Sequence, residues 1–420
     1  MTDLVGRTAQ AARGESVDGF RHRARGWLAG HLPPSPADSE LRHDDARVAH
    51  ERALQLRLWE AGFAGICFPA EYGGLGLDVA YQRAFTEESL PYDMPFSFNV
   101  PTLGILAATL LEFGTREQTD RHLPAILRGE ERWVQFLSEP SGGSDMAGCL
   151  TRADRDGDAF VLNGSKIWTS YASTSDYAMC LARTNWEVPK HSGLTMFIVK
   201  IRQPGVRVEP IRQVNGSTDF FQEYFDDVII PASDVVGKVD DGWTVARRLL
   251  VHERTAVGGG SAYTSGRWAG HDLTTADDSI VEMIRADGAV SDPRCRQLAA
   301  EDRILQLVGR ALVDRITQGI ATGQMPPSAG SITKLFSATH EMRRSEIGLE
   351  LAGAAVAAWP EGTTEMGQLL GVRTLSRQSH SLGGGSNEIQ RNIIGERVLG
   401  MPREYAADRD VPYRQVRRSG

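Results

Sequence analysis

The sequence predicts an α+β protein whose chain passes through a helical domain, a β domain and a second helical domain. Three changes of pattern carry this prediction. Apolar residues recur at helical spacing from Ser16 to about Arg132, short β-branched and aromatic runs fill Trp133 to about Gly237, and helical spacing then returns. The predicted domains are residues 1–132, 133–238 and 239–405, followed by a polar tail at 406–420 that we expect to be loose.

The N-terminal region favours helices because its apolar residues repeat every three to four positions. The clearest predicted helices are residues 46–61, 100–113 and 116–127. A glycine follows each of them closely, at Gly62, Gly114 and Gly129, and glycine commonly ends a helix. We therefore predict an all-α domain here.

The middle region favours strands because β-branched and aromatic residues dominate its short runs, such as KIWT and LTMFIV. Asn163-Gly164 lies between two such runs, and this dipeptide is the strongest short-range signal for a β-hairpin. Asp156-Gly157 predicts a second turn of similar kind. Closely spaced strands and turns over this length indicate a small sandwich or barrel.

The region after Pro231 predicts long amphipathic helices separated by proline and glycine. They cover residues 245–257, 298–321 and 331–359. Breaks are predicted at Asp277-Asp278 and at Ser291-Asp292-Pro293. Long helices joined by such breaks favour a bundle whose helices pack antiparallel.

Composition and charge exclude several classes of protein. The 420 residues include 41% hydrophobic and 24% charged ones, and the net charge is −8 with both signs interspersed, which argues against nucleic acid as a partner. The four cysteines lie far apart without metal-type spacing and are expected to be reduced thiols. The N-terminus lacks the apolar core of a secretory signal, and we see no apolar run of membrane-spanning length. We expect a cytoplasmic protein that does not contact a membrane.

Three motifs occur in order along the chain: FLSEPSGGSD at 136–145, NGSKIWTS at 163–170 and SLGGGSNEIQRNIIGERVLG at 381–400. The third places a glycine run directly before an amphipathic helix. Its bare backbone N–H groups suit a diphosphate or a polarised carbonyl oxygen, although a plain helix-entry turn also explains it. Together the motifs resemble the acyl-CoA dehydrogenase family of flavoproteins, and the resemblance covers about residues 20–405.

The resemblance implies both a fold and a reaction. The fold would be an N-terminal α-helical domain, a middle β-barrel or sandwich domain and a C-terminal four-helix bundle. The implied reaction is α,β-dehydrogenation of an acyl thioester, in which a carboxylate removes the α-proton and the β-hydrogen leaves as hydride to FAD. Such an oxidoreductase of fatty acid and lipid metabolism would pass its electrons to an electron-transfer flavoprotein or a similar acceptor.

The resemblance also implies which residue is the base. Many members carry a Glu just ahead of the Gly-Thr of the C-terminal motif, where this chain has Gly384. Other members carry the base on an earlier helix in an L-x-x-E-R context, which Glu253 matches. Arg254 is expected to order the site, and the backbone N–H of Gly384 is a candidate donor to the thioester carbonyl.

The helix around Glu253 supports this assignment from the residues themselves. The neighbours three and four positions away are Leu249, Leu250, Ala256 and Val257. A carboxyl group buried on such an apolar stripe has a raised pKa, which suits a general base. Periodicity alone leaves two alternatives open: a surface Glu, or a buried Glu paired with a distant Arg.

Further residues are assigned to FAD by resemblance. Those near the flavin ring and the diphosphate are Leu137, Ser138, Gly143, Ser144, Trp168 and Ser170, and those near the adenosine are Ser386 and Glu388. Purely structural interpretations also exist, because strand alternation would bury Trp168 and Ser144-Asp145 could form an ordinary turn. We predict no metal site.

The sequence departs from the family pattern at residues 281–292, which lack the Arg-x-x-Phe-Gly run and the Gln that reach FAD across a subunit interface. We expect a homo-oligomer, a dimer or homotetramer, and keep a heteromer open. In a heteromer this chain could be a non-catalytic or half-site partner subunit, and a flavin monooxygenase or oxidase on the same fold is a further alternative. The sequence does not specify the acyl group, nor whether CoA or a carrier protein bears it.

Overall fold

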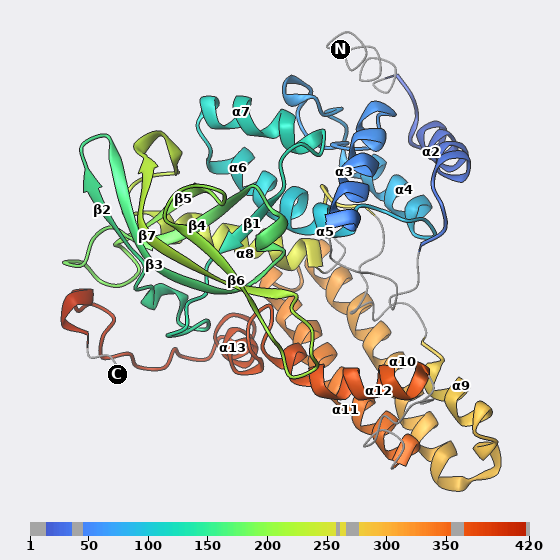
Figure 1. The fold of residues 1–420 in the computed structure, drawn as a ribbon. Coiled ribbons are helices and arrows are strands. Elements are labelled where there is room, and N and C mark those ends of the chain that lie inside the picture. The colour runs from blue at the N-terminus through green and yellow to red at the C-terminus, as the bar shows by residue number, and fades with distance from the viewer. Residues whose placement is uncertain (1–13, 36–44, 258–260, 266–276, 354–364, 417–420) are drawn as a thin grey trace. The chain divides into compact units, whose positions relative to one another are not determined.

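The structure of the protein is a computed structural model, which describes residues 14–35, 45–257, 261–265, 277–353 and 365–416. The chain divides into two compact units. Unit 1 comprises Met1–Arg212, Thr218–Ala269 and Ala406–Gly420, and unit 2 comprises Gln213–Ser217 and Gly270–Tyr405. Unit 1 holds the N-terminal helices, the sheet and helix α8 (Gly242–Val257), whereas the later helices belong to unit 2 (Figure 1).

The N-terminal part of unit 1 is helical, as predicted. Its elements are α2 (Val17–His31), α3 (Asp45–Glu60), the 3-10 helix η2 (Ala70–Tyr72), α4 (Val79–Ser89), α5 (Phe96–Phe98), the π-helix η3 (Asn99–Ala107), α6 (Ala108–Phe113) and α7 (Arg116–Leu127). Helix α7 has the predicted bounds because Thr115 and Gln118 form a capping box at its start.

Phe96–Phe113 is long and apolar enough to cross a membrane by length and composition, so the expectation that no run reaches that length is wrong. In the fold, 72% of this stretch is buried. Leu106 and Leu110 are fully buried in the core of unit 1. The stretch is therefore explained as a core helix.

The middle part of unit 1 is one eight-stranded sheet, which confirms the predicted β domain. Its strands are β1 (Trp133–Phe136), β2 (Arg152–Asp156), β3 (Ala159–Ser170), β4 (Tyr177–Arg183), β5 (Leu194–Lys200), β6 (Val206–Ile211), β7 (Phe220–Pro231) and β8 (Val235–Val236). The strand order is β6-β7-β3-β2-β4-β5-β8, and β1 pairs in parallel with β4.

The hairpin predicted at Asn163-Gly164 is wrong, because both residues lie inside β3. The register between β3 and β7 shifts between Leu162 and Gly164, so the dipeptide forms a bulge. Gly164 has φ 142°, and an added Cβ would lie 2.7 Å from the Cα of Thr151. The turn predicted at Asp156-Gly157 is confirmed, since β2 ends at Asp156 and pairs antiparallel with β3.

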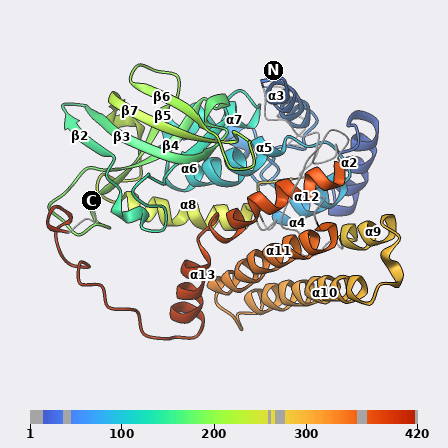
Figure 2. The same cartoon turned by 60° about the horizontal axis from the view of Figure 1, so that its bottom comes forward.

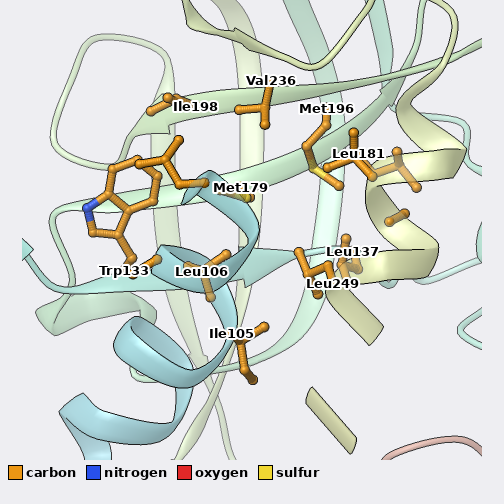
Figure 3. Close-up of a cluster of buried hydrophobic side chains, with 14 of the residues drawn as sticks. Ile105, Leu106, Trp133, Leu137, Met179, Leu181, Met196, Ile198, Val236 and Leu249 are labelled. Carbon is orange, nitrogen blue, oxygen red and sulfur yellow. The ribbon is translucent and has the colours of Figure 1, made fainter. Parts of the chain in front are cut away.

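A hydrophobic core joins the sheet, η3 and α8. Figure 3 shows Leu106 of η3, Trp133 of β1 and Met179 of β4 among these side chains, and Leu137 beside Leu249 of α8. These five side chains are at most 6% exposed. The core therefore fixes the position of α8 against the sheet, one helical turn before Glu253.

Unit 2 is helical, as predicted for the C-terminal region (Figure 2). Its main helices are α9 (Ser279–Ala286), α10 (Pro293–Ala321), α11 (Gly330–Ala352), α12 (Glu365–Ser376) and α13 (Asn387–Ile393). Asp292 caps α10 by accepting the N–H of Arg294 at 2.7 Å, which explains the predicted break there. Residues 354–364, at the end of the predicted segment 331–359, lie outside the described residues.

The expectation of a loose tail is wrong for residues 406–416. Tyr413 is buried, its N–H donates to the carbonyl of Val188 at 2.9 Å, and its hydroxyl donates to the carbonyl of Gly148. The guanidinium of Arg183 lies 3.8 Å from the centre of the Tyr413 ring. An aromatic residue in a polar tail therefore docks the tail on the β domain.

Candidate active site

Glu253 is half-buried on α8 among apolar neighbours. Leu249 and Ala256 are buried, and Leu250 and Val257 pack partly buried against the same core. Burial raises the pKa of the Glu253 carboxyl, although a hydrogen bond from Gln135 and the positive charge of Arg254 act in the opposite direction. The Nε2 of Gln135 donates to the Oε2 of Glu253 at 2.7 Å. The structure thus places this acid in apolar surroundings with a neutral partner.

Arg254, the neighbour expected to order the site, is exposed. Its positive charge favours the ionised form of Glu253. An ordering role for Arg254 stays a prediction.

Backbone contacts bring the first two motifs together beside Glu253. The carbonyl of Ser138 accepts the N–H of Ile167 at 2.9 Å, and the carbonyl of Gln135 accepts the hydroxyl of Thr169 at 3.4 Å. Strand β1 and the residues after it therefore run beside the C-terminal part of β3. Through Gln135 this arrangement also reaches α8, so Glu253 lies in one region with the segments that carry Ser138 and Trp168.

Trp168 has a strained backbone conformation. It has φ 68°, a left-handed conformation that bulky residues rarely adopt, and it lies where the register between β3 and β7 shifts. Its side chain is 55% exposed and meets Phe220 edge-on, with ring centres 6.0 Å apart. The interpretation that strand alternation buries Trp168 is therefore wrong, because the bulge turns the ring outward.

The turn that carries Gly143 and Ser144 is held by a buried acid, Glu139. Its carboxylate accepts the N–H groups of Leu150 at 2.6 Å and Thr151 at 2.9 Å, and the ammonium of Lys166 at 2.9 Å. Burial opposes ionisation, but the charge of Lys166 and these hydrogen bonds hold the pKa of Glu139 at about 2. Gly143 and Ser144 themselves are exposed.

Sequence reasoning missed two further polar residues of the β domain, Gln135 and Glu223. Glu223 on β7 is fully buried, and this burial raises its pKa to about 8, while the hydroxyl of Thr169 donates to its Oε2 at 3.1 Å. Polar residues inside a run of apolar and aromatic ones, as in WVQFL and FFQEYF, are the signal that could have found both.

The residues around Trp168 suit a flat aromatic cofactor with a polar edge, as FAD is. The exposed indole offers a face for stacking. The hydroxyls of Ser138 and Ser170 are half-buried and make no hydrogen bond with any described residue, so both can bond a ligand. Leu137, next to Ser138 in the chain, is buried in the apolar core that also contains Leu249 of α8. These residues fit the flavin part of FAD.

Three predicted residues lie in unit 2, on the glycine loop and at the start of α13. Gly384 is exposed with φ 68°, and its carbonyl accepts the Nε2 of Gln390 at 3.1 Å. Ser386 caps α13 by accepting the N–H of Ile389 at 3.4 Å, and Glu388 is exposed. A helix cap accounts for Ser386, and the ligand roles of these three residues stay predictions. Within the described ranges, no group of three His, Cys, Asp or Glu side chains could hold a metal ion.

The sequence matches three family descriptions over most of its length. Residues 15–130 match "Acyl-CoA dehydrogenase, N-terminal domain", residues 135–228 match the middle domain and residues 240–399 match the C-terminal domain of the same family.

Individual relatives agree with these matches. The chain is 36% identical to acyl-CoA dehydrogenase IpdE1 of Mycobacterium tuberculosis over 395 residues, which cover 93% of this chain and 99% of the relative. Among solved structures, the "Tcur3481-Tcur3483 steroid ACAD" has a TM-score of 0.72 at 28% identity, covering 92% of this chain and 98% of that one. The ChsE4-ChsE5 complex of M. tuberculosis has a TM-score of 0.66 at 26% identity, with the same coverage.

Proposed function

We infer that this chain, which belongs to the acyl-CoA dehydrogenase family, is an FAD-dependent enzyme that introduces an α,β double bond into an acyl thioester with Glu253 as the base. One observation carries the choice of base. Glu253 is a carboxylate in apolar surroundings, bonded among the described residues only by a neutral amide. Burial raises the pKa of such a carboxyl group toward the pH at which a general base operates, whereas a salt bridge lowers it.

In the proposed reaction two C–H bonds of the substrate break. The α-proton goes to Glu253, the electron pair of that bond becomes the new C=C bond, and the β-hydrogen leaves with its pair as hydride. FAD, when bound, supplies the acceptor of that hydride. The raised pKa of Glu253 makes its carboxylate a stronger base and lets the carboxyl group retain the proton until the product leaves.

We propose a bulky, polycyclic acyl group as the substrate. The support is one relative of known structure, a steroid acyl-CoA dehydrogenase that aligns over 92% of this chain. Anaerobic titration with a steroid side-chain CoA ester and with straight-chain CoA esters tests it. Faster flavin bleaching by the steroid ester is expected, and preference for a straight chain would contradict the proposal.

We also propose that the chain assembles with a second, different chain. Two relatives of known structure carry the names of two chains each, and residues 281–292 lack the family's interface run. Light scattering and flavin content of the protein purified alone test this. A homotetramer with one FAD per chain would contradict it, whereas flavin bound only after mixing with a second chain would support it.

The decisive experiment on the reaction is Glu253→Gln. The variant should keep bound FAD and its yellow colour, yet lose bleaching by an acyl thioester under anaerobic conditions. Glu209→Gln, on the exposed strand β6, is the matched control and should bleach like the unmodified protein. Unchanged bleaching in Glu253→Gln would remove Glu253 from the mechanism. Oxygen consumption with a flavin reductase, without any thioester, would instead favour a monooxygenase or oxidase.

A further inference from the structure

Gln135 is positioned by the sheet to reach Glu253. It lies in the middle of β1, where Val134 and Phe136 on either side are buried in the second core of the sheet. Because side chains alternate along a strand, Gln135 points to the opposite face, where α8 packs. Its Nε2 lies 2.7 Å from the Oε2 of Glu253, and it is the one described side chain that hydrogen-bonds this carboxylate.

The chemistry of the contact fixes which way the amide faces. If the Oε1 of Gln135 faced the carboxylate, two acceptors would meet, so the NH₂ group must face Glu253. The Oε1 of Gln135 is buried and has no hydrogen-bond partner among the described residues. The Oε1 of Glu253 makes no hydrogen bond with them either, so this oxygen is left for the α-proton.

Gln118 is a buried glutamine whose amide bonds only to groups of the fold. The Oε1 of Gln118 accepts the N–H of Thr115 at 3.0 Å, and its Nε2 donates to the carbonyls of Ser233 and Val235 at 2.7 and 2.8 Å. Both ends of that amide are satisfied. Gln135 satisfies only the end that faces Glu253, and an unpaired buried acceptor lowers stability. The contact with Glu253 is the one hydrogen bond that the Gln135 side chain makes among the described residues.

Among the described residues, no cation contacts the carboxylate of Glu253 in place of Gln135. Besides β1, the main elements packed against α8 are η3, α6, β4 and β5, and neither β1 nor η3 has an ionisable side chain. Glu112 of α6 is bound by Arg248 and His252 on α8, at 2.7 and 3.1 Å. The remaining ionisable side chains of these elements, of α8 itself and of segment 261–265 are Tyr177, Cys180, Arg183, Lys200, Arg247, Arg254 and Tyr263. Of all these groups, Arg254 is the one whose charge acts on Glu253.

We propose that Gln135 is the positioning residue of the base: it holds one carboxylate oxygen of Glu253, directs the other to the substrate's α-carbon and keeps the group ionised. This inference rests on the proposed function of Glu253. Removing a hydrogen bond to a charged group shifts the balance between the two protonation states by about one to two pH units. The loss of Gln135 must therefore move the pH at which the base becomes active.

The first test is Gln135→Met, which keeps the length of the side chain and removes its donor. The rate of flavin bleaching by a thioester should rise with pH, as in the unmodified protein, but with a midpoint about one to two pH units higher. The plateau rate at high pH should be about tenfold lower than that of the unmodified protein, because the carboxylate is no longer oriented. Gln203→Met is the matched control, because Gln203 is also half-buried and donates one hydrogen bond, to the carbonyl of Lys200 at 2.8 Å. Its profile should not move.

The second test does not depend on turnover. The infrared C=O band of the protonated Glu253 carboxyl, identified by its loss in Glu253→Gln, is titrated with pH in the thioester-free protein. Gln135→Met should move the midpoint upward, and an unchanged midpoint with an unchanged bleaching profile would overturn the proposal. If Gln135→Met does not fold, Gln135→Asn, whose shorter side chain cannot reach Glu253, is judged by the same two criteria.

These results separate the two inferences. Bleaching retained in Glu253→Gln would refute the proposed function, while the infrared titration would still report whether Gln135 controls ionisation of Glu253. Bleaching lost in Glu253→Gln together with an unmoved profile in Gln135→Met would leave the base in place and refute the role of Gln135.

Discussion

In unit 1, the carboxyl groups of Glu139 and Glu253 are both shielded from water, but their surroundings shift the pKa in opposite directions. Glu139 lies in the turn after β1, where two backbone N–H groups and the buried ammonium of Lys166 surround it. Glu253 lies where β1 meets α8, and a neutral amide is its one hydrogen-bond donor among the described residues. The pKa of Glu139 is held at about 2, whereas burial raises that of Glu253. The ionised Glu139 is suited to hold a loop through its hydrogen bonds, whereas Glu253, with its raised pKa, is suited to accept and release a proton.

Glu223 shows that a buried carboxyl group without a cationic partner has a raised pKa, which is what distinguishes Glu253 from Glu139. It is fully buried, like Glu139, and it lies opposite Lys166 in the register of β3 and β7. The ammonium of Lys166 nevertheless bonds Glu139, and the pKa of Glu223 rises to about 8. The substitution of Glu by Gln at positions 139, 223 and 253 therefore removes a different electrostatic contribution at each.

The largest effect on stability is expected from Glu139→Gln. The substitution leaves the ammonium of Lys166 buried without its counter-charge, and breaking a buried ion pair in this way costs about 3–5 kcal/mol. Urea unfolding at pH 7 measures the loss. Because the folded pKa of Glu139 is depressed to about 2, its contribution exists above pH 4.5 and should fade as pH falls toward 2.

The double variant Glu139→Gln/Lys166→Met is the control for this prediction, since it removes both charges and should recover part of the loss. A loss below about 1 kcal/mol in Glu139→Gln, within the range of an ordinary hydrogen bond, would show that Lys166 does not depend on Glu139.

A smaller effect, with the opposite sign, is expected from Glu223→Gln. The folded pKa of about 8 lies above the usual value of 4.5, so between these values the folded state holds a proton that the unfolded state has lost. Stability from this group is complete below pH 4.5 and decreases as pH rises, by about 1.4 kcal/mol per pH unit, until pH 8. From pH 6 to pH 8, the free energy of unfolding of the variant should therefore rise by about 2–3 kcal/mol relative to that of the unmodified protein.

Urea unfolding of both proteins at pH 5, 6, 7 and 8 measures this gain. Parallel pH dependences of the two proteins would mean that Glu223 is already ionised in the folded state. Thr169 can still donate to the amide oxygen of the variant, so this hydrogen bond does not confuse the comparison.

Local patterns predicted what depends on near neighbours in sequence. The bounds of α7 follow from Thr115 and Gln118 at its start and from Gly129 after its end. The surroundings of Glu253 follow in part from the residues one turn away on the same helix, of which Leu249 and Ala256 are fully buried. The three-domain order follows from the change of period along the chain.

Contacts between residues far apart in sequence could not be predicted from these local patterns. Gln135 and Glu253 are 118 residues apart, and no local period indicates that β1 meets α8. The hairpin predicted at Asn163-Gly164 is wrong because its partner strand, β7, begins 56 positions after it, and pairing with β7 turns the dipeptide into a bulge. The outward ring of Trp168 has the same cause, since it depends on a second shift in that register.

The smallest effect on stability is expected where the effect on chemistry is largest, in Glu253→Gln. The amide resembles the protonated carboxyl in shape and can still accept a hydrogen bond from Gln135. At acidic pH the free energy of unfolding of the variant should therefore differ from that of the unmodified protein by less than about 1 kcal/mol. Because burial raises the folded pKa of Glu253, the unmodified protein loses stability as pH rises, and the variant should not share this loss. Urea unfolding at pH 5 and pH 8, beside the bleaching assay, measures both properties. A loss as large as that of Glu139→Gln would make Glu253 a structural charge, and the contrast between the two carboxylates would then fail.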